Sequence, residues 1–144
     1  MDTPLVAQAT MRIAAPRARV WDALVDPAQI KRYFFGTDVA TTWAVGGPIL
    51  WRGEWQGQPY EDKGTVLQVE PERRLQFTHF SPLAGQPDVP ASYHTITIEL
   101  TGEGDMTEVT LAQDNNATED ERAHSAANWG MVLGSLKALL EGAA

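Results

Sequence analysis

The feature that most constrains the fold is a series of short alternating segments between residues 37 and 111, followed by one long helical pattern. Within each segment apolar residues recur at every second position, and Gly, Pro, Asn or Asp separates one segment from the next. A period of two is the pattern of a strand with one buried face. Because the connections are short, consecutive strands should pair antiparallel as a meander. The sequence therefore predicts six consecutive strands, near 37–43, 49–55, 60–70, 75–80, 93–100 and 109–111.

Period two also predicts which side chains share a face of each strand. Three sets of residues are each predicted to share one strand face: Val39, Thr41 and Trp43; Ile49, Trp51, Gly53 and Trp55; Thr65, Leu67 and Val69.

The one long helical pattern begins at a capping box, Thr118-Glu119-Asp120-Glu121, in which Thr and Glu three residues apart satisfy free N–H groups. It predicts a helix to about Glu141. The helix has an apolar stripe at spacings of three and four, formed by Trp129, Val132, Leu133, Leu136, Leu139 and Leu140. One face of the sheet and this helix must then bury each other.

Before the alternating segments the sequence predicts a strand over 5–13 and two short helices. The first runs over 16–25, with Pro16 where a first helical turn tolerates proline. The second begins at Asp26-Pro27 and ends near Phe34. The order of strand, two short helices, six strands and long helix predicts an α+β fold in which a curved antiparallel sheet wraps the C-terminal helix.

Composition narrows the functional classes. The 144 residues fit a single domain over 1–144 and include no cysteine, which excludes a disulfide framework, a thiolate zinc site and a cysteine nucleophile. The net charge of -8 disfavours binding to nucleic acid or to an anionic membrane surface. No signal peptide or membrane-spanning stretch is visible, so a cytoplasmic location is expected.

Three segments resemble the START-like superfamily, also called the SRPBCC or helix-grip fold, in its branch of homologues of the activator of the heat-shock-protein-90 ATPase. The first is Ile13-Ala14-Ala15-Pro16 with 20–24 and 30–35. The second is Gly46-Gly47 with 64–71 and Arg74-Leu75. The third is 107–111 with Asn128-Trp129-Gly130 and 133–140. Each is a signature of turns and core positions, and none is a catalytic signature.

The resemblance implies a helix-grip fold and three functional alternatives. Superfamily members commonly bind lipids, hormones, polyketides or other hydrophobic compounds between sheet and helix, and some are cyclases or hydrolases. Eukaryotic co-chaperones of this branch activate the chaperone's ATPase but carry a second, N-terminal domain, for which this chain has no room. The co-chaperone function is therefore possible but not favoured. Monomers and dimers are both common, so a monomer or homodimer is expected.

Large aromatic side chains could either line a cavity or fill a solid core. The sequence carries five tryptophans, and Gly53 lies between two of them on one strand face, where glycine often marks a close approach or an open space. On a helix-grip fold the cavity is favoured. Its predicted ligand-binding residues are Trp43, Trp51, Trp55, Tyr60, Phe77, His79, His94, Ser125 and Trp129.

Among these, His79 and His94 fall on apolar strand faces and could orient a polar group of a ligand or serve as satisfied core histidines. Neither has a third partner at a metal-binding spacing, so no metal and no cofactor is predicted. Either Glu61 or Asp62 should point toward the cavity, because adjacent strand residues face opposite ways. Arg122 could meet a ligand carboxylate, or pair with a nearby Glu.

No nucleophile motif or phosphate loop is present, and no catalytic residue is predicted. The first hypothesis is therefore a protein that binds a small hydrophobic or aromatic molecule. The second is a cyclase- or hydrolase-type enzyme using the same pocket, with His79, His94 or Asp62 as acid or base. The third is a chaperone-activating interaction module. The sequence favours a binding protein over an enzyme, and it does not identify the ligand.

Overall fold

A computed structural model describes residues 5–34, 36–55, 57–82, 85 and 87–142, with the side chain of Trp55 excepted. Along the chain the elements are β1 (Ala7–Ile13), α1 (Arg17–Val25), α2 (Pro27–Tyr33), β2 (Asp38–Ala40), β3 (Pro48–Trp55), β4 (Gln58–Glu70), β5 (Arg74–His79), β6 (His94–Glu103), β7 (Met106–Gln113) and α3 (Glu119–Leu140), with a short 3-10 turn over Pro90–Ser92. The predicted order of elements and the α+β helix-grip class are confirmed.

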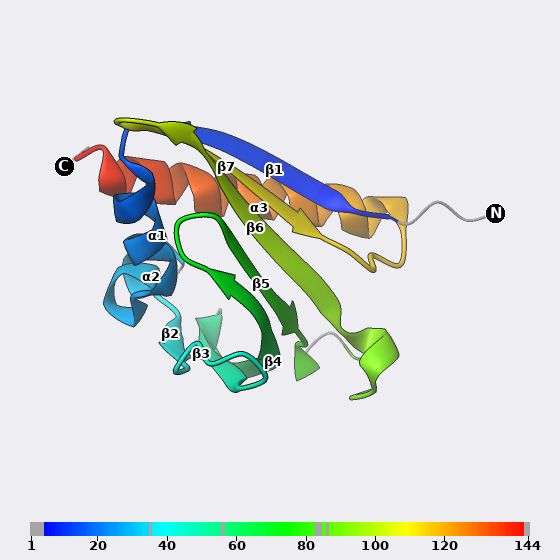
Figure 1. The fold of residues 1–144 in the computed structure, drawn as a ribbon. Helices are drawn as coiled ribbons and strands as arrows, with labels where there is room; N and C mark the ends of the chain where they lie inside the picture. The colour runs from blue at the N-terminus through cyan, green and yellow to red at the C-terminus, as the bar shows by residue number, and fades with distance from the viewer. Residues whose placement is uncertain (1–4, 35, 56, 83–84, 86, 143–144) are drawn as a thin grey trace.

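The sheet is antiparallel and has the strand order β1-β7-β6-β5-β4-β3-β2. From β2 to β7 it is the predicted meander. β1 completes it by pairing with β7, so that Ala7 lies opposite Gln113 and Ile13 opposite Thr107. Figure 1 shows α3 running along the sheet behind β1 and β7, with α1 and α2 at its C-terminal end. No helix among the described residues is long and apolar enough to cross a membrane.

Local signals in the sequence explain where the helices begin. The side chain of Asp26 accepts a hydrogen bond from the N–H of Ala28 at 3.1 Å, and Pro27 occupies the first turn of α2. At α3 the hydroxyl of Thr118 accepts from the N–H of Glu121 at 3.1 Å, and the Glu121 carboxylate accepts from the N–H of Ala117 at 3.1 Å. The predicted capping box is therefore confirmed, with its second bond made one residue before the cap.

The core lies between the sheet and the C-terminal half of α3. Val132, Leu133 and Leu136 are buried there against sheet residues such as Ile96 and Leu111. In contrast, α3 carries no buried residue from Glu119 to Met131. The apolar stripe of α3 thus packs as a core only along its second half, and its first half leaves space between helix and sheet.

Two predicted strand faces are corrected. The strand expected over 37–43 ends at Ala40, and Trp43 lies beyond β2 with a positive φ of 62°. On β4, Leu67 is 40% exposed whereas Val69 packs against the core, so Thr65, Leu67 and Val69 do not share the predicted face. The cause is a β-bulge between Val66 and Gln68, which shifts the register against β5 and turns Val69 to the side of the fully buried Val66.

Candidate ligand-binding cavity

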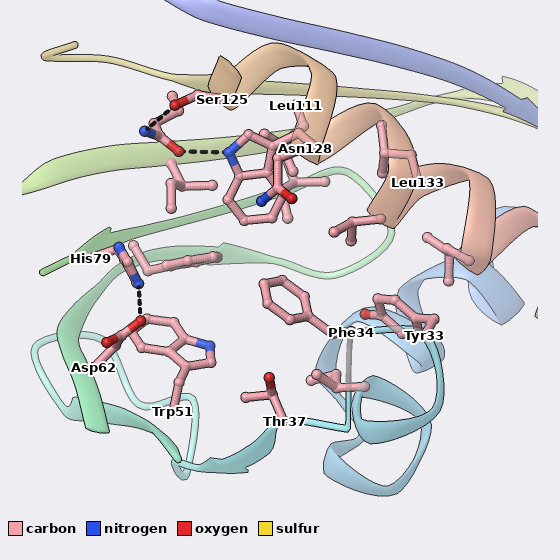
Figure 2. A pocket seen from close by; sticks show the side chains of 18 of the residues that line it. Tyr33, Phe34, Thr37, Trp51, Asp62, His79, Leu111, Ser125, Asn128 and Leu133 are labelled. Atoms are coloured by element: carbon pink, nitrogen blue, oxygen red, sulfur yellow. Dashed lines mark hydrogen bonds and ion pairs between the residues drawn. The ribbon is translucent and has the colours of Figure 1, made fainter. Parts of the chain in front are cut away.

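A cavity of about 490 Å³ lies between the sheet and the middle of α3. Its lining brings together side chains from α2, β3, β4, β5 and α3, which are far apart in the sequence (Figure 2). This volume is within the range of small-molecule sites, roughly 300 to 1,000 Å³. The cavity occupies the space between the sheet and the part of α3 that carries no buried residue.

An aromatic wall forms one side of the cavity. The ring of Trp51 lies 5.5 Å from that of Phe77 and 5.0 Å from that of His79, measured between centroids. On the helix side, Trp129 meets Phe34 edge to face at 5.6 Å. Aromatic pairs prefer such tilted and edge-to-face arrangements, which stabilise them beyond simple burial of area. On each side of the cavity the aromatic rings therefore pack against one another, and the rest of their surface lines the cavity.

Trp43 reaches the cavity from a strained backbone position. A φ of 62° is unfavourable for a bulky residue and costs about 1–3 kcal/mol. Two hydrogen bonds hold it there: its indole N–H donates to the carbonyl of Val25 at 2.7 Å, and its backbone N–H donates to the Thr41 hydroxyl at 3.0 Å. The loop after β2 thus fixes a large ring in the lining, next to the end of α1.

Gly53 is closely approached by the side chain of Tyr60. Gly53 on β3 pairs with Tyr60 on β4, and a Cβ on Gly53 would lie 2.6 Å from the Tyr60 hydroxyl oxygen. The phenol ring therefore covers the glycine. The Tyr60 hydroxyl is also hydrogen bonded to the hydroxyl of Thr37 at 2.6 Å, and Thr37 is fully buried. This pair closes the cavity lining between β4 and the segment before β2.

The most polar part of the lining is a carboxylate–imidazole pair. The Nε2 of His79 lies 2.9 Å from the Oδ2 of Asp62, and the side chains are 27% and 16% exposed (Figure 2). Asp62 is the inward member of the adjacent acids, because Glu61 points out and pairs with Arg52 at 2.6 Å. The other oxygen of Asp62, Oδ1, is buried with no hydrogen-bond partner among the described residues. An unpaired buried group of this kind costs about 1–3 kcal/mol or more.

Two polar atoms of the lining are left open. Within the described residues, neither the Nδ1 of His79 nor the indole nitrogen of Trp51 has a hydrogen-bond partner, and neither belongs to the buried unpaired atoms, which are Asp62 Oδ1 and Arg74 Nε. Because a carboxylate only accepts, the Nε2–H of His79 donates a hydrogen bond to Asp62 Oδ2, and in the neutral form of the imidazole the lone pair is then at Nδ1. The aromatic wall therefore offers one hydrogen-bond acceptor and one donor.

A second polar cluster, between β7 and α3, is satisfied internally. Gln113 is 8% exposed, and its side-chain oxygen accepts from the indole N–H of Trp129 at 2.6 Å. Its amide nitrogen lies 3.4 Å from Asn116 Oδ1 and 3.3 Å from Ser125 Oγ. The cluster orients the Trp129 ring in the cavity lining and joins the last strand to the helix.

Tyr33 closes the cavity at the end near α1. Its hydroxyl donates to the carbonyl of Ala23 at 3.0 Å, and burial raises its pKa far above the ordinary range. The phenol therefore stays neutral, and its ring contributes apolar surface while its polar atom is satisfied by the backbone.

The structure brings most of the predicted site residues together around the cavity. Those that line it are Trp43, Trp51, Tyr60, Phe77, His79, Ser125 and Trp129. His94 is not part of the lining, because its Nδ1 bonds the carbonyl of Asp114 at 2.8 Å at the end of β7. The side chain of Trp55 lies outside the described residues. Arg122 pairs with Glu119 at 2.8 Å, which is the surface alternative predicted for it.

Phe34 also lines the cavity; the sequence places it in a connection, 34–36, expected near the mouth of the cavity. Tyr33, Thr37 and Gln113 line it as well and were not predicted. Gln113 could have been found, because it continues the period-two face of Val109 and Leu111. No local signal marks Tyr33 or Thr37. Among the described residues, no three His, Asp or Glu side chains cluster as a metal ion would require.

Comparison with known proteins adds a family and several similar structures. The family model described as Activator of Hsp90 ATPase homolog 1-like protein matches residues 14–141. No curated protein matches significantly. A solution structure from Cytophaga hutchinsonii is 51% identical, covers 99% of this chain and 97% of its own, and superposes with a TM-score of 0.85.

Two more distant structures share the fold. DynU16, a protein of the dynemicin biosynthetic locus, is 23% identical with a TM-score of 0.77, covering 94% of this chain and 47% of its own. The Aha1 dimer of Colwellia psychrerythraea is 22% identical with a TM-score of 0.73, covering 94% of this chain and 96% of its own. At these identities the likeness speaks for the fold alone.

Proposed function

This chain belongs to the family of Activator of Hsp90 ATPase homolog 1-like proteins, and on that premise we propose that it binds a small hydrophobic or aromatic molecule in the cavity between the sheet and α3. The observation that carries the proposal is the first half of α3. It has no buried residue from Glu119 to Met131, yet it stands over a cavity of about 490 Å³ walled by aromatic rings. A protein selected only for stability would fill such a space, because each empty methyl-sized volume weakens packing.

The chemistry of the lining supports an aromatic ligand. Trp51, Phe77 and Trp129 offer ring surface on opposite sides of the cavity. Flat rings stack on or meet such surfaces edge to face, and each such contact is favourable beyond area burial. The few polar atoms then fix the ligand's orientation, as is usual for small-molecule sites.

The test is a screen of hydrophobic and aromatic metabolites by thermal stability and tryptophan fluorescence. A ligand at a hundredfold excess over its dissociation constant should stabilise the fold by about 2.7 kcal/mol. Trp51→Ala removes the centre of the aromatic wall and should weaken binding of any hit by about tenfold or more. Met106→Ala, at a 43% exposed position of β7 outside the cavity, is the matched control and should leave binding unchanged. A Trp51→Ala variant that binds a proven ligand as the parent does would contradict the proposal.

A second candidate function rests on the Asp62–His79 pair. An imidazole oriented by a carboxylate inside an apolar cavity is a common arrangement for a general base. An enzyme of cyclase or hydrolase type would use it to move a proton of a bound substrate. Turnover of a cavity ligand that is lost in His79→Gln while binding persists would support this function. Unchanged ligand after prolonged incubation with the parent protein would count against it.

The oligomeric state of the protein is a further part of the proposal. The Colwellia psychrerythraea structure is of a dimer, and for this chain we propose a monomer or a homodimer. Light scattering across a range of protein concentrations distinguishes them. Activation of a chaperone ATPase stays the least favoured function, and absence of stimulation at high molar excess would exclude it.

A further inference from the structure

The Asp62–His79 pair engages one imidazole nitrogen and leaves the other, Nδ1, without a partner in the described part of the chain. Nε2 of His79 is engaged by the Oδ2 of Asp62 at 2.9 Å, and a carboxylate can only accept. In its neutral form the imidazole therefore carries its proton on Nε2 and has its lone pair at Nδ1. Figure 2 shows His79 and Asp62 beside Trp51 on one side of the cavity.

The Nδ1 of His79 is free to meet a ligand. It forms no hydrogen bond within the described part of the chain, and it is not one of the buried unpaired atoms there. His79 itself lines the cavity. An acceptor that is left open beside an apolar space favours a ligand with a donor group and disfavours one that would cover it with carbon, because the acceptor would then lose its hydrogen bond to water.

The lining also contains Asp62, Glu54, Ser81, His124 and Asn128, and the unpaired Oδ1 of Asp62 is a second acceptor next to His79. Other polar groups of the lining are already paired. The hydroxyls of Thr37 and Tyr60 bond each other at 2.6 Å, and the oxygen of Gln113 accepts from Trp129 at 2.6 Å. Apart from Asp62, the neighbour of His79 in the wall is aromatic, with the Trp51 ring 5.0 Å away. A donor group that reaches His79 is therefore best carried by a flat apolar body, which can contact this ring.

We propose, resting on the proposed binding function, that the ligand is an aromatic molecule bearing a hydroxyl group, a phenol or an enol, which donates its proton to the Nδ1 of His79 in a hydrogen bond. Asp62 is a positioning residue that fixes the imidazole tautomer and orientation. The Oδ1 of Asp62 is buried and has no partner among the described residues, so a ligand donor bound beside His79 would also lie near a second acceptor.

The test compares two probes of nearly equal shape, 2-naphthol and 2-methylnaphthalene, by calorimetry or by displacement of the neutral dye N-phenyl-1-naphthylamine. The parent protein should bind both. His79→Phe should weaken 2-naphthol by about tenfold while changing 2-methylnaphthalene by less than about twofold, because only the hydroxyl loses its acceptor. Met106→Ala should alter neither probe.

Asp62→Leu tests the positioning role and also guards against a His79→Phe variant that fails to fold. Nitrogen-15 spectra of the imidazole should show the Nε2-protonated tautomer in the parent, with the Nδ1 signal shifting when 2-naphthol is added. In Asp62→Leu they should show a mixture of tautomers, and 2-naphthol should bind severalfold more weakly while 2-methylnaphthalene does not.

Each contrary outcome identifies what failed. If neither probe binds the parent protein, the binding function itself is wrong. If both bind and His79→Phe weakens both equally or neither, the cavity is a binding site but His79 is not its acceptor. If Asp62→Leu leaves the tautomer and the 2-naphthol affinity unchanged, Asp62 does not position the imidazole.

Discussion

Gly64 lies against the backbone of Thr78, so closely that a Cβ on Gly64 would be 1.8 Å from the Thr78 carbonyl oxygen. The N–H of Thr65 also donates to the Thr78 hydroxyl at 2.9 Å. Asp62 on β4 and His79 on β5, which are within hydrogen-bond distance of each other, lie close to this approach in the two strands. Glycine at position 64 therefore allows β4 and β5 to come together next to the cavity's polar end.

Gly64→Ala is expected to lower the free energy of unfolding by at least about 2 kcal/mol, because the added methyl group would meet rigid backbone. Gly130→Ala in α3 is the matched control. Nothing lies within 4 Å of its Cβ position, so this change should raise the free energy of unfolding by about 0.5–1 kcal/mol. Urea unfolding of both variants checks the prediction, and equal effects would show that the approach at Gly64 is not tight.

The Thr37–Tyr60 hydroxyl pair should behave as one unit. Thr37→Val and Tyr60→Phe each remove one partner of the bond at 2.6 Å, and each should cost about 1–2 kcal/mol because Thr37 is fully buried. The double variant should lose clearly less than the sum of the two. A double-mutant cycle on unfolding free energies measures the coupling, and strict additivity would contradict the contact.

Gln113 holds the Trp129 ring, so Gln113→Leu should leave the indole N–H without its acceptor and cost about 1–3 kcal/mol. Ser125→Ala removes two longer contacts of the same cluster, from Gln113 Nε2 at 3.3 Å and to Asn116 Oδ1 at 3.2 Å, and should cost less than about 1 kcal/mol. Thermal unfolding of the two variants gives the comparison. The reverse ranking would mean that Trp129 is positioned by packing alone.

The last turn of α3 gives a pH-dependent contribution to stability. The ammonium of Lys137 and the N–H of Ala14, at 2.9 Å, hold the pKa of Glu141 below its ordinary value. A lowered pKa in the folded state means that the contribution is complete above the ordinary pKa, about 4.3, and is lost as the pH falls through the lowered value.

Glu141→Gln should therefore lower the melting temperature at about pH 7, and the difference from the parent should shrink toward about pH 3. Melting curves across this range test it. A difference that stays constant with pH would show that the Glu141 charge does not contribute.

The sequence was sufficient for the order of elements because alternation, turn residues and the Thr118 capping box are local signals. The sequence was insufficient where the conformation or the buried face of a residue depends on contacts with distant segments. The bulge beside Leu67 reverses a face that simple alternation predicts, because register depends on the neighbouring strand. Trp43 departs from its predicted strand for a similar reason, since a bond to Val25 at 2.7 Å holds it in a positive-φ conformation.

The candidate site shows the same division. The aromatic lining follows from strand faces, and alternation correctly makes one of Glu61 and Asp62 point inward. Which acid does so, and that it meets His79, depends on strand pairing, which places Asp62 opposite Trp51 and Glu61 opposite Arg52. His94 has the same strand parity as Ile96, yet it bonds the carbonyl of Asp114 outside the cavity, a contact between residues 20 positions apart in sequence.

The most direct test of the central claim is a two-dimensional NMR titration of the indole N–H signals of the five tryptophans with naphthalene. Trp51 and Trp129 line the cavity, whereas Trp21 packs against the core outside it. The account predicts saturable shifts for Trp51 and Trp129 with Trp21 unchanged. No shift at the solubility limit of naphthalene, or a shift of Trp21 as large as that of Trp51, would contradict it.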